Sequence, residues 1–294
     1  EFKLRKKIMP DKTLEELKQT EGGMLAAGLR AQNRKLKLIF AGLIFLCLLY
    51  AAWLLSHHMV WQSWPYIILS YALIFMMKSC MLRVHEPLNR DCDPYLAQEA
   101  YAYYYVKGKI EKRPRSREIY VILFAKCKAL QGDTENALKL LCGVDRKRLT
   151  GSWLCVYYEV RRICCIIQND AAIKGSGGIP DFHGALLQLR GELDGEISGR
   201  TVGAKVKRTL ERELERIDLY LSMERGSLEV YHVLSGKRRW RKGTELQRVI
   251  NRYTDAKACV MQNDLKGARE HCRYIAGHGG RVVFVELARR MQPG

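Results

Sequence analysis

The stretch that decides the architecture is residues 38–77, which read LIFAGLIFLCLLYAAWLLSHHMVWQSWPYIILSYALIFMM. It contains no Asp, Glu, Lys or Arg and is about twice as long as the roughly 20 residues that one membrane-spanning helix requires. We therefore expect two spanning helices, at 38–55 and from 64 to about 82, joined by a loop at 56–63. Pro65 suits the first turn of the second helix, where a backbone N–H is not needed.

Charges on the two sides of this stretch indicate its orientation. Residues 1–37 carry ten Lys or Arg against five Asp or Glu, Arg83 and Arg90 follow the second apolar run, and the loop has no Lys or Arg. The positive-inside rule then predicts a multi-pass protein of the cell membrane with both termini in the cytoplasm. The alternatives are a hairpin buried in a soluble protein and a cleaved signal peptide. The first would bury forty uncharged residues, and the second does not explain two consecutive apolar runs.

The chain divides into three regions by composition. These are a basic cytoplasmic segment at 1–37, a transmembrane hairpin at 38–83 and a cytoplasmic helical domain at 84–294. The 294 residues include 50 Lys or Arg and 31 Asp or Glu, which gives a formal net charge of +19. A surplus of this size favours a negatively charged neighbour such as anionic lipid, an acidic protein or nucleic acid.

A short helix is expected ahead of the hairpin. Thr13 and Glu16 have the spacing of a capping box, and Gly22 and Gly23 are expected to end the helix. An amphipathic helix on the membrane surface and a solvated helix remain alternatives.

The region after the hairpin contains an internal repeat of turn residues. Each expected turn separates two apolar-periodic segments, and the four turns are centred on Gly132, Asn169, Gly226 and Asn263. Their spacings are 37, 57 and 37 residues, and a Gly-rich insertion at 173–180 accounts for the longer one. Gly or Asn at a helix end supplies the left-handed conformation, and a following Asp or Ser caps the next helix.

Small residues follow two of these turns, because Ala137 and Ala268 each lie five residues after a turn centre. The pattern resembles the tetratricopeptide repeat, in which Gly ends the first helix and a small Ala lies in the second. The resemblance covers about residues 95–291, and Lys174 and Tyr231 depart from it where Ala belongs. It implies an α-solenoid of helix pairs with a concave groove. Further helices are expected at 95–106, 201–224 and 281–291, so the predicted fold class is all-α.

The motifs of common enzymes and cofactor sites are absent from the sequence. There is no GxSxG, HExxH or Walker motif, and the ten cysteines form no CxxC pair, so no enzyme activity, cofactor or metal site is predicted. On the cytoplasmic side the cysteines are expected to be reduced residues of the core.

Two sets of residues are the candidates for partner binding. One is the basic segment Lys237, Arg238, Arg239, Trp240, Arg241 and Lys242, which suits anionic lipid or an acidic protein better than nucleic acid, with a solvated loop as the alternative. The other is Lys126 and Lys257, which the resemblance places on the groove, where they would hold an acidic peptide or a carboxylate. The expected function is that of a membrane-anchored adaptor or assembly factor. The alternative is an accessory subunit of a membrane transport or secretion complex.

Overall fold

The computed structural model describes residues 12–80, 84–149, 151–172, 182–199, 203–237 and 243–291, and these residues form helices and no strand. The all-α prediction is therefore confirmed for the described part of the chain. The first elements are α2 Leu14–Gln19, α3 Glu21–Ser56, α4 Val60–Cys80, α5 Glu86–Asn89 and α6 Pro94–Lys107. They are followed by η1 Ile110–Lys112, α7 Pro114–Leu130, α8 Thr134–Cys142, η2 Arg146–Arg148 and α9 Ser152–Ala172. The last are α10 Phe182–Gly199, α11 Ala204–Glu224, α12 Glu229–Ser235, α13 Glu245–Met261, α14 Leu265–His278 and α15 Val283–Met291.

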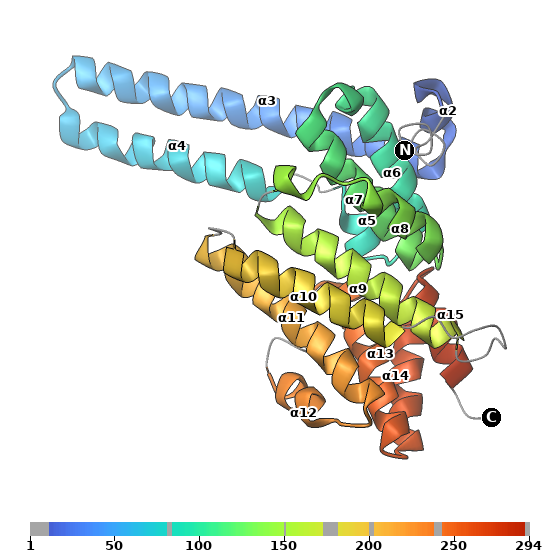
Figure 1. The fold of residues 1–294 in the computed structure, drawn as a ribbon. Helices are drawn as coiled ribbons and strands as arrows, with labels where there is room; N and C mark the ends of the chain where they lie inside the picture. Colours follow the sequence, from blue (N-terminus) through green and yellow to red (C-terminus); the bar gives the residue numbers. More distant parts are fainter. Residues whose placement is uncertain are drawn as a thin grey trace.

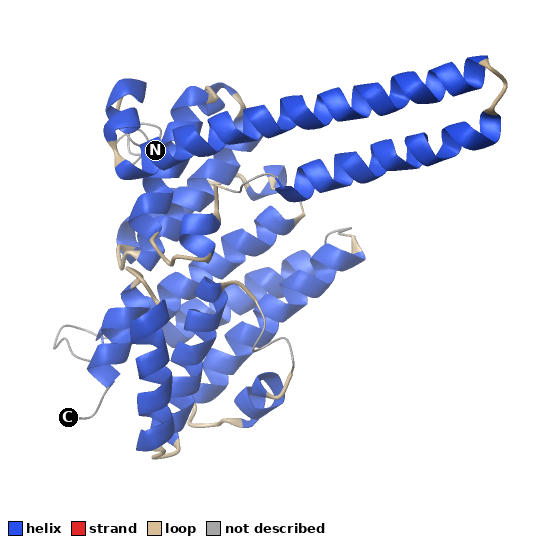
Figure 2. Ribbon diagram, turned by 180° about the vertical axis from the view of Figure 1, so that it is seen from behind, coloured by secondary structure: helices blue, strands red, loops and turns tan. Residues whose placement is uncertain are grey.

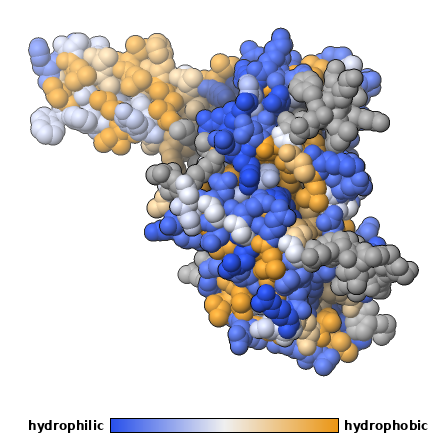
Figure 3. Space-filling view, viewed as in Figure 1, coloured by the Kyte–Doolittle hydropathy of each residue, from blue (hydrophilic) through white to orange (hydrophobic). Residues whose placement is uncertain are grey.

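Helices α3 and α4 form an antiparallel hairpin that projects from the remaining helices, which we call the body (Figure 1). Both are long and apolar enough to cross a membrane, and only 11% of the most apolar window of each is buried. Large apolar side chains such as Leu38, Phe45 and Phe75 are exposed on the hairpin. Figure 3 shows the contrast, with hydrophobic side chains on the hairpin and many hydrophilic ones on the visible face of the body.

The loop of the hairpin is shorter than the sequence predicted. Helix α3 ends at Ser56 and α4 begins at Val60, so the expected loop at 56–63 is reduced to three residues. His58 takes the left-handed conformation, with φ of 58°, and the Met59 N–H donates to the Leu54 carbonyl at 2.9 Å. This early turn puts Pro65 inside α4, in its sixth position, and not in the first turn as expected.

The expected capping box at Thr13 and Glu16 is present, but Gly22 and Gly23 do not end the first helix. Thr20 separates α2 from α3, and its hydroxyl accepts a hydrogen bond from the Gly23 N–H at 3.1 Å. Gly22 lies where α3 crosses α6, since an added Cβ would be 2.4 Å from the Leu96 carbonyl oxygen. The glycines therefore permit close packing within a continuous helix.

Three of the four expected turns in the body are present. Gly132, Gly226 and Asn263 have φ values of 87°, 75° and 57°, and they separate α7 from α8, α11 from α12 and α13 from α14. The turn expected at Asn169 is wrong, because α9 continues through this residue to Ala172. The insertion expected at 173–180 lies outside the described residues.

Helix α9 lies at the centre of the body, packed against α7, α8, α10 and α11 (Figures 1 and 2). The C-terminal segment returns to the beginning of the body. There the Arg281 N–H donates to the Cys92 carbonyl at 3.0 Å, and a Cβ on Gly132 would contact Val283 at 3.2 Å. The first and last parts of the body therefore contact each other around α9.

Candidate functional site

Lys126 and Lys257, the two lysines expected to face a binding groove, both pair with carboxylates of α9. The Lys126 Nζ is 3.0 Å from Glu159 Oε2, and the Lys257 Nζ is 2.6 Å from Asp170 Oδ1. Their side chains are 12% and 21% exposed, so both are largely covered. Tyr253 also donates its hydroxyl to Asp170 Oδ2, at 2.6 Å. These contacts join α7 and α13 to the central helix, α9.

The basic segment that the sequence singled out is described only at its first residue. Lys237 Nζ lies 3.1 Å from Glu215 Oε1 of α11, in a pair that is more than one-third exposed on both sides. Arg238, Arg239, Trp240, Arg241 and Lys242 lie outside the described residues. The structure therefore leaves the prediction for these five residues as a prediction.

A buried ion-pair cluster, which the sequence did not reveal, joins α9 to α11. Arg162 is 1% exposed, and its Nε donates to Glu213 Oε2 at 3.0 Å, while Arg216 contacts the other carboxylate oxygen. Burial alone would raise the pKa of Glu213, but the neighbouring Arg216 and Arg162 outweigh it, so the pKa is lowered. The cluster holds an ionised carboxylate inside the body and joins two helices.

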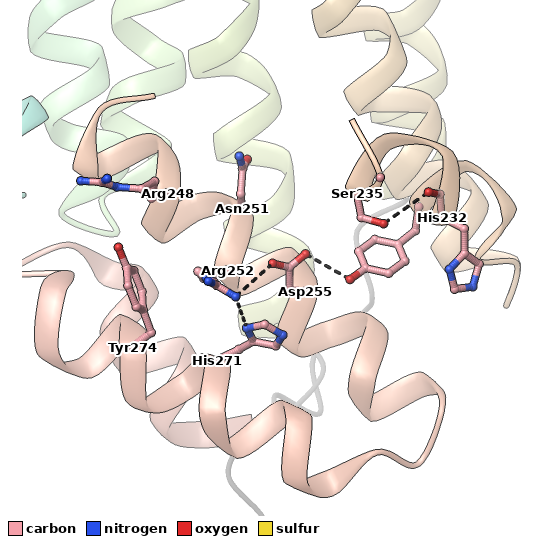
Figure 4. Close-up of a pocket in the computed structure, with 10 residues that line it drawn as sticks. His232, Ser235, Arg248, Asn251, Arg252, Asp255, His271 and Tyr274 are labelled. Carbon is pink, nitrogen blue, oxygen red and sulfur yellow. Dashed lines mark hydrogen bonds and ion pairs between the residues drawn. The ribbon is translucent and has the colours of Figure 1, made fainter. Parts of the chain in front are cut away.

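A polar pocket of about 330 Å³ opens between α12, α13 and α14 (Figure 4). Arg252 lies at its centre, where Nη1 donates to His271 Nδ1 at 3.0 Å and is 4.0 Å from Asp255 Oδ2. The guanidinium also lies over the ring of Tyr274, 5.2 Å from its centroid. Tyr231 closes the α12 side by donating its hydroxyl to Asp255 Oδ1 at 3.1 Å. Each of these neighbours restricts the orientation of Arg252.

Burial and neighbouring charges set the protonation of the pocket. Burial lowers the pKa of His271, and Arg252 adds to the effect, although Asp255 opposes it. His271 is therefore neutral at pH 7, with Nδ1 as the acceptor of the bond from Arg252. Burial, followed by Asp255, raises the pKa of Tyr231, so its hydroxyl remains a donor.

Two arginines of α13 line one side of the pocket. Arg248 lies one helical turn before Arg252 on α13, is held by Glu245 and has a side chain that is 44% exposed. A guanidinium has five N–H donors, so an arginine held by one internal partner keeps donors for a ligand. Two guanidinium groups on one face fit a carboxylate better than a neutral group.

The sequence contained one signal for this pocket. Arg248, Arg252 and Asp255 recur at helical spacing on α13, and Tyr231 occupies a position where the repeat pattern calls for Ala. In the structure the Tyr231 hydroxyl reaches Asp255 across the pocket. The contact with His271 could not be read from spacing, because it depends on how α14 packs against α13.

The other candidates for chemistry within the described residues are clusters of metal-ligating side chains and the cysteine thiols. No group of three His, Cys, Asp or Glu side chains there has the arrangement of a metal site, and the nine cysteines described are free thiols. Burial raises the pKa of Cys155 to about 11 and that of Cys92 to about 12, so both stay protonated at neutral pH.

No family model, no curated protein and no solved structure matches this chain.

Proposed function

We propose that this protein is a membrane-anchored adaptor. Its α3–α4 hairpin crosses the cell membrane, and its body binds an acidic segment of a partner protein on the cytoplasmic side. The observation that carries the proposal is the continuity of α3, a single helix of 36 residues. Its first part packs against α2 and α6 of the body, and its second part carries exposed apolar side chains.

The dimensions of α3 support this division. Residues 38–56 would extend about 28 Å at about 1.5 Å per residue, close to the roughly 30 Å of a hydrocarbon core. Four exposed cations, Arg30, Arg34, Lys35 and Lys37, lie just before this apolar part, where headgroups would surround the helix. Because α3 has no break between the two parts, the body is held in a fixed relation to the hairpin.

The pocket beside Arg248 and Arg252 is the proposed site for the partner. Its arginines are oriented by Glu245 and His271 and are open to solvent on one side, whereas Lys126 and Lys257 are engaged with α9. A carboxylate in the pocket would gain charge-assisted hydrogen bonds worth about 1.5–3 kcal/mol each. An acidic peptide is therefore the class of partner segment that this site favours.

A binding experiment with the full chain in detergent micelles tests the proposed partner. The probe is a fluorescent hexaglutamate peptide, with hexalysine as its opposite, and binding is followed by anisotropy. We expect hexaglutamate alone to bind, and an Arg248→Gln/Arg252→Gln variant to bind at least roughly tenfold more weakly.

The matched control is Arg269→Gln/Arg273→Gln. These arginines are exposed on α14 with the same spacing of four residues, so the variant has the same net charge. Equal weakening by both variants would mean that overall charge, and not the pocket, binds the peptide. Failure of the wild-type chain to bind hexaglutamate would contradict the proposed partner class.

The anchor is tested separately. Membranes from expressing cells are washed with alkaline carbonate, which removes peripheral proteins. The proposal predicts that the chain stays in the membrane pellet, whereas release into the supernatant would contradict it.

A further inference from the structure

The end of the body at which α10 leads into α11 points in the same direction as the hairpin. Figures 1 and 2 view the molecule from opposite sides, and in both this end extends beyond the other helices of the body toward the tip of the hairpin. If the hairpin crosses a bilayer, the beginning of α11 is therefore carried to the membrane surface from which α3 enters.

The beginning of α11 is basic and exposed. Its first nine residues contain four exposed cations, Lys205, Lys207, Arg208 and Arg212. Two exposed carboxylates lie nearby in the sequence, Glu211 on the same helix and Asp194 on α10. The four cations exceed these carboxylates by two charges.

These cations differ from most other basic residues of the body in having no internal partner. No ion pair joins Lys205, Lys207, Arg208 or Arg212 to another described residue, whereas Arg146, Arg161 and Arg190 are all paired with carboxylates of α10 or α11. Cations in the first turn also oppose the helix dipole, whose positive end is at the N-terminus. Neither internal pairing nor helix stability therefore accounts for the cluster.

We propose that the start of α11 docks on the anionic headgroups of the leaflet from which α3 enters the membrane. This inference rests on the proposed membrane anchor. The cations of α3, from Arg30 to Lys37, and those of α11 then form two separate contacts with one lipid surface. The body lies along the membrane, and the pocket between α12, α13 and α14 keeps a fixed direction relative to it.

The charge of the start of α11 and the direction in which it points indicate that lipid headgroups bind there. An anionic leaflet attracts Lys and Arg side chains within about one Debye length, roughly 10 Å at 0.1 M salt. Any soluble acidic partner would have to fit between the start of α11 and the membrane beside it. Lipid headgroups are already there once the hairpin is inserted.

A fluorescent label at Gly203 reports the docking directly. Gly203 is exposed, and a Cβ added there would meet nothing within 4 Å, so Gly203→Cys is expected to be tolerated. The full chain, carrying Cys142→Ser to remove an exposed native thiol, is labelled with NBD and reconstituted into nanodiscs. These contain phosphatidylcholine alone or with phosphatidylglycerol, and a headgroup spin label acts as quencher.

We expect quenching at position 203 in the anionic discs, little quenching in the neutral discs and a decrease as salt is added. A label at Gly277→Cys is the reference, since a Cβ added there would meet nothing within 4 Å and the helix that contains it, α14, lies away from the hairpin in Figure 1. It should remain unquenched in both kinds of disc.

Replacing Lys205, Lys207 and Arg208 by Gln should reduce the docked-to-undocked ratio by roughly tenfold or more. The matched control replaces Lys266, Arg269 and Arg273 of α14, which are equally exposed, and should leave quenching unchanged.

The possible results distinguish a failure of the proposed docking from a failure of the proposed membrane anchor. A chain that enters the discs but shows no extra quenching at position 203 in anionic lipid overturns the docking and leaves the anchor intact. Equal loss of quenching in the two triple variants also overturns it, because net charge would then suffice. A chain that does not enter the discs overturns both.

Discussion

The hairpin and the body are both helical, but they differ in which side chains they expose and which they bury. The hairpin exposes Leu46 and Phe75 at 63% and 72%, whereas the body buries Arg162 at 1% and Glu213 at 5%. In the body, the buried Arg162 of α9 is matched by Glu213 of the neighbouring helix α11. On the hairpin, large apolar side chains are exposed instead. The two regions therefore suit different surroundings. Substitutions that unpair a buried charge should destabilise the body, and substitutions that add a charge should impair insertion of the hairpin.

The largest effect is expected at the buried ion pair of the body. Arg162→Ala leaves Glu213 with only Arg216, and Glu213→Ala leaves a buried guanidinium without its carboxylate. Removing one partner of a buried pair costs about 3–5 kcal/mol. Urea denaturation of the full chain in detergent, followed by circular dichroism, measures the loss. An Arg162→Ala/Glu213→Ala double variant should lose less stability than the sum of the two single losses, and additive losses would show that the two side chains are not coupled.

The next largest effect is expected in the hairpin, and it concerns insertion. Leu46→Arg places a charge near the middle of the apolar part of α3, which costs about 2.5–3.5 kcal/mol of insertion free energy. The fraction of protein resistant to carbonate extraction should fall, with Leu46→Phe as the conservative control. Urea denaturation of the body should be unchanged in both. Full insertion of the Leu46→Arg variant would contradict the proposal that this part of α3 lies in the hydrocarbon core.

A smaller effect is expected where helices of the body cross closely. Ala137 and Ala268 are 0% and 1% exposed, so a leucine at either position overpacks the contact. Ala137→Leu and Ala268→Leu should each cost about 1–3 kcal/mol, measured by the same denaturation. Unchanged stability in both variants would show that these helix crossings can accommodate a leucine side chain.

The smallest effect is a dependence of body stability on pH. The pKa of Glu213 is lowered in the folded state, so this residue stabilises the fold above the ordinary carboxyl pKa of 4.5. That contribution is lost as the pH falls below 4.5, through the lower pKa of the folded state. Glu192 is also lowered, because Arg161 and Arg146 outweigh the effect of its burial, so it acts in the same direction. Together they should make the body progressively less stable as the pH falls below 4.5.

Thermal melting across a pH series measures this loss. Glu213→Gln should flatten the acid limb of the stability curve. An unchanged acid limb in that variant would assign the pH dependence to other carboxylates.

Local signals in the sequence predicted much of the fold. The uncharged run predicted the hairpin, and Gly132, Gly226 and Asn263 predicted turns that need a left-handed residue. Asp264 caps α14 as expected, accepting a hydrogen bond from the Gly267 N–H at 2.9 Å. In each case the decisive interaction lies within a few residues of the signal.

Long-range contacts explain what the sequence could not predict. Asp170 was expected to cap a new helix, but its carboxylate binds Tyr253 and Lys257 of α13, and α9 continues past it. The pocket depends likewise on Arg252 meeting His271 across two helices. Such pairings are decided by packing, and no spacing rule within one segment encodes them.

Labelling of cysteines in intact cells tests the central claim, that the hairpin crosses the membrane with the body inside. Met59→Cys places a thiol in the hairpin loop, and the native Cys142 is exposed on the body. A membrane-impermeant maleimide should label the Met59→Cys thiol in intact cells and reach Cys142 only after permeabilisation. Labelling of Cys142 in intact cells while the loop thiol stays protected would contradict the orientation. Equal protection of both thiols in intact cells would contradict the crossing itself.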